Sequence, residues 1–164
     1  MTLTTAQLST LKAYIETNPT WIAYSHDSDG AAQIARDLQA TSSPLFVVWR
    51  TSVEEQEYTN DPSWQGTNWS WTVFIARSIA EKAGYERMFI GGAIDPSKEN
   101  IRDGFVDVFN GENAQLLHMS AVSKRETNLL EELFATGTGT VNAPAVMEVE
   151  GSLTYKDILL AMEW

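Results

Sequence analysis

Hydrophobic side chains recur every three to four positions over most of this chain, a spacing that predicts helices with one buried face. In residues 4–15, Leu8, Leu11 and Ile15 share such a face, and Thr4 with Gln7 has the spacing of a capping box. The same periodicity and similar end signals predict further helices over residues 29–40, 78–89, about 97–110, 112–124 and 126–135. The chain is therefore expected to be mainly α-helical.

A β element is expected near the middle of the chain. Residues 45–53 (LFVVWRTSV) are rich in β-branched and aromatic side chains and predict a strand. Residues 54–66 are polar and read as a loop or hairpin excursion, and residues 69–74 fit either a second strand or the start of a helix. We expect a β hairpin or short sheet near residues 45–74.

The last thirty residues differ in character from the rest. Residues 136–140 (TGTGT) read as a Gly/Thr hinge, followed by a strand near residues 145–149 and a short helix over residues 154–162. The expected fold class is mainly α with a small β element. It would consist of a compact helical body over residues 1–135 and an extended C-terminal arm over residues 136–164.

Composition places the chain among globular proteins. It has 164 residues, of which 43% are hydrophobic and 20% charged, so one domain with a real core is expected. Cysteine is absent, which excludes disulfides, thiolate metal sites and cysteine nucleophiles. The first ten residues lack the basic and apolar regions of a secretory signal, and no apolar stretch approaches the ~18 residues of a membrane span. We expect a soluble protein that stays in the cytoplasm where it is made.

The formal net charge of −11 narrows the class of partner. Affinity for nucleic acid comes mainly from Lys and Arg that neutralise phosphates, so sequence-specific DNA binding is not expected. An acidic surface would instead let DNA pass without adhering.

One segment invites an enzymatic interpretation. Residues 25–30 (SHDSDG) follow an apolar run and precede a helix, which resembles the first metal-binding motif of DHH-type phosphoesterases. Such a site needs further acidic and histidine ligands, and the only other histidine, His118, is expected in mid-helix without an acidic neighbour in sequence. The simpler interpretation is that Asp27, Ser28 or Asp29 caps the helix. We therefore expect no enzyme, no metal and no cofactor, with a metal-dependent phosphoesterase as a remote alternative.

Five segments of the chain form a recognisable series. They are residues 43–53 (SPLFVVWRTSV), 95–102 (DPSKENIR), 107–111 (DVFNG), 133–140 (LFATGTGT) and 150–157 (EGSLTYKD). In this order they resemble a family of short proteins encoded in the head-morphogenesis region of tailed phages and prophages, near the major capsid gene. The resemblance covers about Gln33 to Ala161 and is weakest between Val53 and Arg77.

The resemblance implies a structural role in the phage particle, with assembly in the host cytoplasm. The first hypothesis is a head–tail connector (adaptor) subunit that forms a ring beneath the portal, at the head–tail junction of the virion. The alternative is a capsid-associated minor head or decoration protein. The expected partners are copies of itself, the portal protein and other neck or tail proteins, and the major capsid protein is a further candidate; no membrane and no sequence-specific nucleic acid are expected.

Aromatic and arginine side chains are over-represented in binding hot spots, so they are the first candidates for interface residues. Trp49 and Arg50 are the main candidates, although Trp49 fits a core position equally well. The arm would add contacts through its hinge and terminal helix. The full candidate set is Trp49, Arg50, Trp64, Trp69, Trp71, Thr136, Gly137, Gly139, Tyr155 and Trp164.

Overall fold

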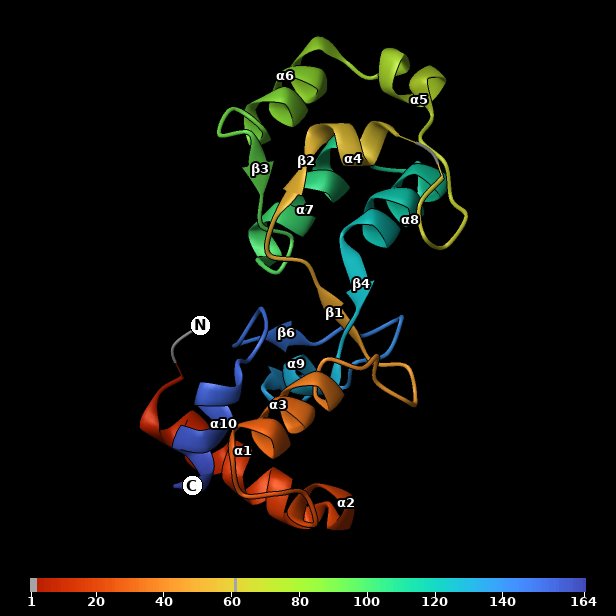
Figure 1. Ribbon diagram of the computed structural model, residues 1–164. Helices are drawn as coiled ribbons and strands as arrows, with labels where there is room; N and C mark the ends of the chain where they lie inside the picture. The colour runs from red at the N-terminus through yellow and green to blue at the C-terminus, as the bar shows by residue number, and fades with distance from the viewer. Residues whose placement is uncertain (1–2, 61) are drawn as a thin grey trace. The chain divides into compact units, whose positions relative to one another are not determined.

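The computed structural model describes residues 3–60 and 62–164 (Figure 1). Over these residues the protein is mainly α-helical, with three small sheets of two strands each. The predicted fold class, mainly α with a small β element, is confirmed. None of the helices in the described ranges is long and apolar enough to cross a membrane.

The helices are short, and most of the strands hold only two residues. The helices are α1 (Thr5–Thr17), α2 (Pro19–Ile22), α3 (Ser28–Asp37), α4 (Glu55–Thr59), α5 (Trp71–Ala76), α6 (Ile79–Met88), α7 (Glu99–Val108), α8 (Asn113–Val122), α9 (Leu129–Leu133) and α10 (Tyr155–Met162). The strands are β1 (Val47–Trp49), β2 (Val53–Glu54), β3 (Ala93–Ile94), β4 (Lys124–Glu126), β5 (Ala135–Thr136) and β6 (Val146–Met147). The sheets pair β1 with β4, β2 with β3, and β5 with β6.

The chain forms two compact units, and the second is inserted into the first. The first unit contains the described residues up to Val47 together with Glu126–Trp164, and the second contains Val48–Arg125. The chain passes into the second unit within β1 and leaves it within β4, and these two strands pair. This division differs from the boundary expected after residue 135. The actual boundary lies where β1 pairs with β4, two strands that are far apart in sequence.

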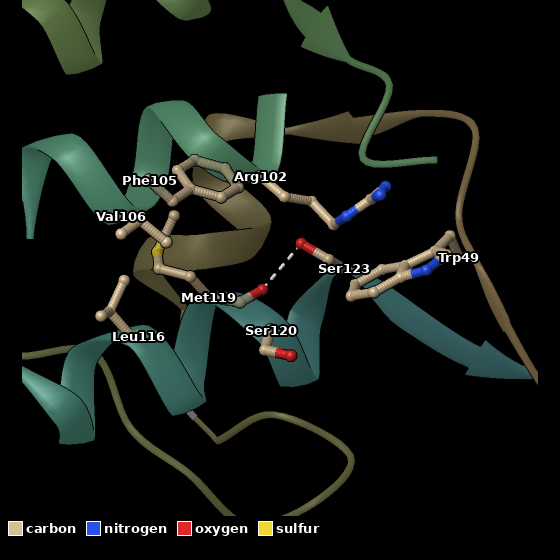
Figure 2. Close-up of a pocket in the computed structure, with 8 residues that line it drawn as sticks. All are labelled: Trp49, Arg102, Phe105, Val106, Leu116, Met119, Ser120 and Ser123. Atoms are coloured by element: carbon tan, nitrogen blue, oxygen red, sulfur yellow. Dashed lines mark hydrogen bonds between the residues drawn. The ribbon is translucent and has the colours of Figure 1, made fainter. Parts of the chain in front are cut away.

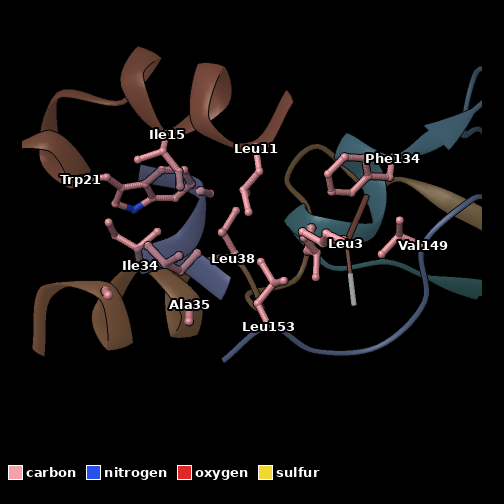
Figure 3. Packing of buried hydrophobic residues seen from close by; sticks show 14 residues of the cluster. Leu3, Leu11, Ile15, Trp21, Ile34, Ala35, Leu38, Phe134, Val149 and Leu153 are labelled. Carbon is pink, nitrogen blue, oxygen red and sulfur yellow. The ribbon is translucent and has the colours of Figure 1, made fainter. Parts of the chain in front are cut away.

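The core of the first unit is built from both ends of the chain. Helix α10 packs against α3 and α1, and Ile158 of α10 is fully buried. Figure 3 shows this cluster, in which Val149 and Leu153 take part with side chains from α1 and α3. Residues 136–164 are therefore part of a core, and the expectation of an extended C-terminal arm is corrected. The cluster joins this segment to Leu11 and Ile34, which lie more than a hundred positions earlier in the sequence.

The expected Gly/Thr hinge is held against neighbouring segments. Val47 N donates to Gly139 O at 2.7 Å, and Ala145 N donates to Val47 O at 3.0 Å. A Cβ added at Gly139, which has φ +65°, would lie 2.3 Å from the Phe46 ring. Glycine is required here both by the backbone conformation and by this close approach.

Local signals placed several helix starts correctly. The capping box of Thr4 with Gln7 opens α1, and that of Ser78 with Glu81 opens α6. The Asp27 side chain accepts hydrogen bonds from the backbone of Asp29 and Gly30, so it caps α3 as proposed. These bonds satisfy backbone N–H groups that the first helical turn leaves without a partner.

The β segments differ from the expectation for residues 45–74. The strand expected over residues 45–53 is limited to β1, and β1 and β2 pair with β4 and β3 rather than with each other. Residues 71–76 form helix α5, so the helix alternative for residues 69–74 is the correct one. Residues 126–135, expected as one helix, hold the end of β4, helix α9 and the start of β5. A single sequence does not reveal which distant strand a short apolar run will meet.

The core of the second unit is mainly aromatic. The ring of Tyr85 on α6 lies 5.1 Å from that of Phe89, and Tyr58 on α4 lies 5.3 Å from Phe105 on α7, measured between centroids. Trp69 lies 5.6 Å from Tyr85. Edge and tilted contacts of this kind are favourable beyond the area they bury. They hold α4, α6 and α7 around one cluster.

Candidate functional site

Trp49, at the end of β1, lies close to two cationic side chains. The Arg102 guanidinium of α7 is 4.6 Å from the centre of the indole, and the Lys124 ammonium of β4 is 5.1 Å from it. A cation over an aromatic face is attracted by the negative charge of the π system. Burial lowers the pKa of Lys124 below its usual value. The indole therefore holds the Arg102 and Lys124 charges close to one aromatic ring in the second unit.

A pocket of about 160 Å³ opens beside this tryptophan (Figure 2). We call it the Trp49 pocket. Its walls are mainly apolar side chains of α7 and α8, with two serine hydroxyls and the Arg102 guanidinium at its edges. The lining residues are Trp49, Arg102, Phe105, Val106, Leu116, Met119, Ser120 and Ser123.

Arg102 is positioned by the backbone and keeps its charge available. Its Nη1 donates to the carbonyls of Pro96 and Ser97, both at 2.7 Å. None of the ion pairs formed among residues 3–60 and 62–164 involves Arg102. Since arginine stays protonated at all ordinary pH values, this charge can pair with a carboxylate from outside the chain. The pocket thus suits an acidic group carried next to an apolar one.

Arg50 makes its contacts within the second unit. Its Nη2 donates to Glu57 Oε2 at 2.6 Å, and its Nη1 donates to Val122 O at 3.3 Å. Burial raises the pKa of Glu57, but the hydrogen bond from Glu54 N and the Arg50 charge outweigh it and leave this pKa below its usual value. Arg50 therefore links α4 to the end of α8.

The inner side of the pocket rests on a pair of buried hydroxyls. Tyr58 Oη and Ser123 Oγ lie 2.9 Å apart, and Ser123 Oγ donates to Met119 O at 2.7 Å. Burial raises the pKa of Tyr58 well above its usual value, so the phenol stays protonated. This arrangement fixes the start of β4 against α4.

Replacing Tyr58 by phenylalanine is expected to lower the free energy of unfolding by about 0.5–1.5 kcal/mol, the net value of one hydrogen bond. The loss stays in this range because Ser123 still donates to Met119 O and is not left unsatisfied. Tyr155→Phe, at an exposed position, is the control and should change stability by less than about 0.5 kcal/mol. Urea unfolding followed by circular dichroism measures both, and equal effects would contradict the role of the buried pair.

The other candidate interface residues do not gather at this pocket. In the second unit, Trp69 is buried in the aromatic core, Trp64 donates through Nε1 to Ala121 O at 2.7 Å, and Trp71 is exposed. In the first unit, Tyr155 is exposed at the start of α10. Trp164 stacks on His26 with ring centres 4.4 Å apart.

The candidate residues of the expected hinge, Thr136, Gly137 and Gly139, pack against neighbouring backbone or side chains. Thr136 lies in β5 and pairs with Val146, and its hydroxyl donates to Glu148 Oε1 at 3.1 Å. A Cβ added at Gly137 would lie 3.0 Å from the Cα of Ala145. Together with Gly139, these residues bring residues 136–140 close to β6 and Phe46.

Sequence reasoning missed Arg102 and the walls of the pocket. Arg102 and Val106 are four residues apart on α7, so a shared helix face could have been recognised. Their proximity to Trp49 could not, because it depends on the pairing of β1 with β4. The exposed isoleucines of α5 and α6 were also missed, since they interrupt the periodic pattern rather than follow it.

The SHDSDG segment has structural roles in the first unit. Asp27 caps α3, and the His26 ring stacks on Trp164. His118 is buried in α8, where its Nε2 lies 2.6 Å from Tyr58 O. Within residues 3–60 and 62–164, no group of three or more His, Asp or Glu side chains is arranged to hold a metal ion.

Comparison with known proteins adds no relative. The chain matches no protein-family model, no curated protein and no solved structure. The resemblance to phage head-morphogenesis proteins stays a prediction from its sequence motifs.

Proposed function

We propose that this chain is a structural subunit of a tailed-phage particle. It would act as a head–tail connector subunit that forms a ring beneath the portal and binds copies of itself and neighbouring neck proteins. The resemblance of its sequence segments to phage head-morphogenesis proteins supports the location. The surface of the second unit supports the mode of action.

The observation that carries this proposal is a run of large apolar side chains on the outside of α5 and α6. Trp71 is 54% exposed, Ile75 68% and Ile79 85%. Trp71 and Ile75 are one helical turn apart on α5, and Ile79 opens α6 directly afterwards. We call these three residues the α5–α6 surface. Large apolar side chains exposed at neighbouring positions, as Trp71 and Ile75 are, indicate a site of protein contact, because leaving them in water is unfavourable.

The overall acidity is compatible with the proposed station. A ring beneath the portal surrounds the path of DNA, and a net charge of −11 would repel phosphates rather than bind them. DNA could then move past the ring without being retained.

The test is incorporation into particles. In a phage that encodes this chain, the double substitution Ile75→Asp with Ile79→Asp is expected to leave the subunit folded, since both side chains are exposed, but to remove it from purified virions. Thr72→Asp, on a neighbouring exposed position of α5, is the matched control and should still be incorporated. Quantitative mass spectrometry of purified particles measures the result.

The copy number in wild-type particles separates the structural alternatives. One ring per particle supports a connector, whereas one subunit per capsid position would indicate a decoration protein. Absence of the wild-type chain from mature particles would overturn the proposed function.

A further inference from the structure

We infer that the Trp49 pocket of one copy binds the segment Val146–Glu150 of a second copy. This inference rests on the proposed function, because it assigns the contact by which a self-associating subunit would form its ring. We call residues 146–150 the acidic strip. The pocket lies in the second unit and the strip in the first.

The pocket has the chemistry of a receptor for an apolar group beside a carboxylate. Phe105, Val106, Leu116 and Met119 offer an apolar wall, and its volume of about 160 Å³ accommodates a branched aliphatic side chain. Arg102 stands at the edge and makes no ion pair with the described residues. A carboxylate arriving there would form a charge-assisted hydrogen bond, the stronger kind.

The acidic strip presents the complementary pattern. From Ala145 to Glu150 burial alternates, so Val146, Glu148 and Glu150 are exposed while Met147 and Val149 are buried. Val146 is 40% exposed. Alternate residues of an extended chain face the same side, roughly 6–7 Å apart. Val146 could therefore enter the pocket while Glu148 reaches Arg102.

The charge that favours this pairing is local. Both units are net negative, since the first holds three Lys and Arg residues against eleven Asp and Glu, and the second holds eight against eleven. The attraction comes from the Arg102 guanidinium of one copy meeting the Glu148 carboxylate of the other. A complementary charge pair of this kind fixes the orientation of the partner.

This contact joins two different surfaces of the same chain and is therefore heterologous. Repeated contacts of this kind form a ring when the rotation between neighbours closes, and a filament when it does not. A two-fold dimer, in which the same patch meets itself, is not expected.

The first test exchanges the charges. Arg102→Glu and Glu148→Arg are each expected to weaken self-association at least about tenfold, because like charges then face each other at the contact. An equimolar mixture of the two variants should associate as the wild type does, since the altered pocket accepts the altered strip. Sedimentation velocity over a protein concentration series, at one fixed salt concentration, measures all three samples.

Two variants serve as matched controls. Arg87→Glu on α6 and Glu16→Arg on α1 make the same charge changes at exposed positions outside the pocket and the strip. Both should associate like the wild type. If either control weakened self-association as much as Arg102→Glu does, the effect would come from the change in net charge, and the inference would be overturned.

The second test uses the absence of cysteine. Val106→Cys and Val146→Cys, mixed under mild oxidation, should give a disulfide-linked heterodimer in excess over either homodimer. In the control mixture, Leu117→Cys, at an exposed position on α8 outside the pocket, replaces Val106→Cys. This mixture should give no such excess of the heterodimer. An equal yield from both mixtures would contradict the assigned contact.

The outcomes separate this inference from the proposed function. If the wild type associates but neither charge variant weakens it, or if the mixture fails to recover, the contact is wrong while the structural role stands. If the wild type stays monomeric at millimolar concentration, a second copy is ruled out as the occupant, and incorporation into particles still tests the function. If Arg102→Glu loses incorporation with unchanged self-association, the pocket binds another virion protein, and the inference is overturned.

Discussion

Ile158→Ala is expected to lower the free energy of unfolding of the first unit by about 2–5 kcal/mol, the usual range for truncating a buried aliphatic side chain. Ile158 is fully buried on α10, in the cluster that also holds Leu11 of α1 and Ile34 of α3. The substitution removes apolar contacts and leaves a cavity, because a packed core relaxes only partly around the missing atoms.

The same helix offers a control. Leu160 is 64% exposed, so Leu160→Ala should change stability by less than about 0.5 kcal/mol. Urea unfolding followed by circular dichroism gives the stability, and hydrogen–deuterium exchange of α1 and α3 assigns the loss to the first unit. If the two alanine variants behave alike, α10 is not part of this core. Deletion of residues 136–164 should expose α1 and α3 to rapid exchange for the same reason.

Gly30→Ala should destabilise the first unit by at least about 3 kcal/mol, the upper end of the range for overpacked sites. Gly30 is buried in the first turn of α3, and a Cβ placed there would lie 2.0 Å from Ser25 O and 2.9 Å from Ser25 C. These are backbone atoms, so no flexible side chain can move aside. The turn that precedes α3 would have to open.

Gly84→Ala is the matched control for this substitution. It lies within α6, where an added Cβ would be 3.9 Å from Val108 Cγ2, an ordinary contact. Alanine is favoured over glycine within a helix by up to about 1 kcal/mol, so this variant should be more stable than the wild type. Thermal unfolding midpoints compare the two, and a wild-type midpoint for Gly30→Ala would contradict the close approach of Ser25.

Much of the local structure could be predicted from short-range signals. Thr4 with Gln7 and Ser78 with Glu81 placed the starts of α1 and α6, because a capping box acts within four residues. A cap at Asp27, Ser28 or Asp29 was also expected, and Asp27 is the residue that caps α3. These features depend on neighbours in sequence, which one chain reveals by itself.

What could not be predicted depends on contacts between distant residues. The apolar residues Val149, Leu153 and Ile158 looked like part of an arm, because nothing in sequence shows that α1 and α3 will cover them. The pairing of β1 with β4 places Trp49 beside Lys124 and Arg102, which are more than fifty residues away in sequence. Of the eight residues that line the candidate site, the sequence therefore predicted only Trp49.

The pairing of β1 with β4 also determines how the chain could be rebuilt. The two strands run in opposite directions, since Thr127 N donates to Phe46 O and Arg50 N donates to Ser123 O. Residues 48–125 thus begin and end on adjacent strands, so a two-residue turn could replace them, or another domain with neighbouring ends could be grafted there. Recombination at these two positions would exchange the second unit as a whole and leave the first unit, with its eleven Asp and Glu residues, intact.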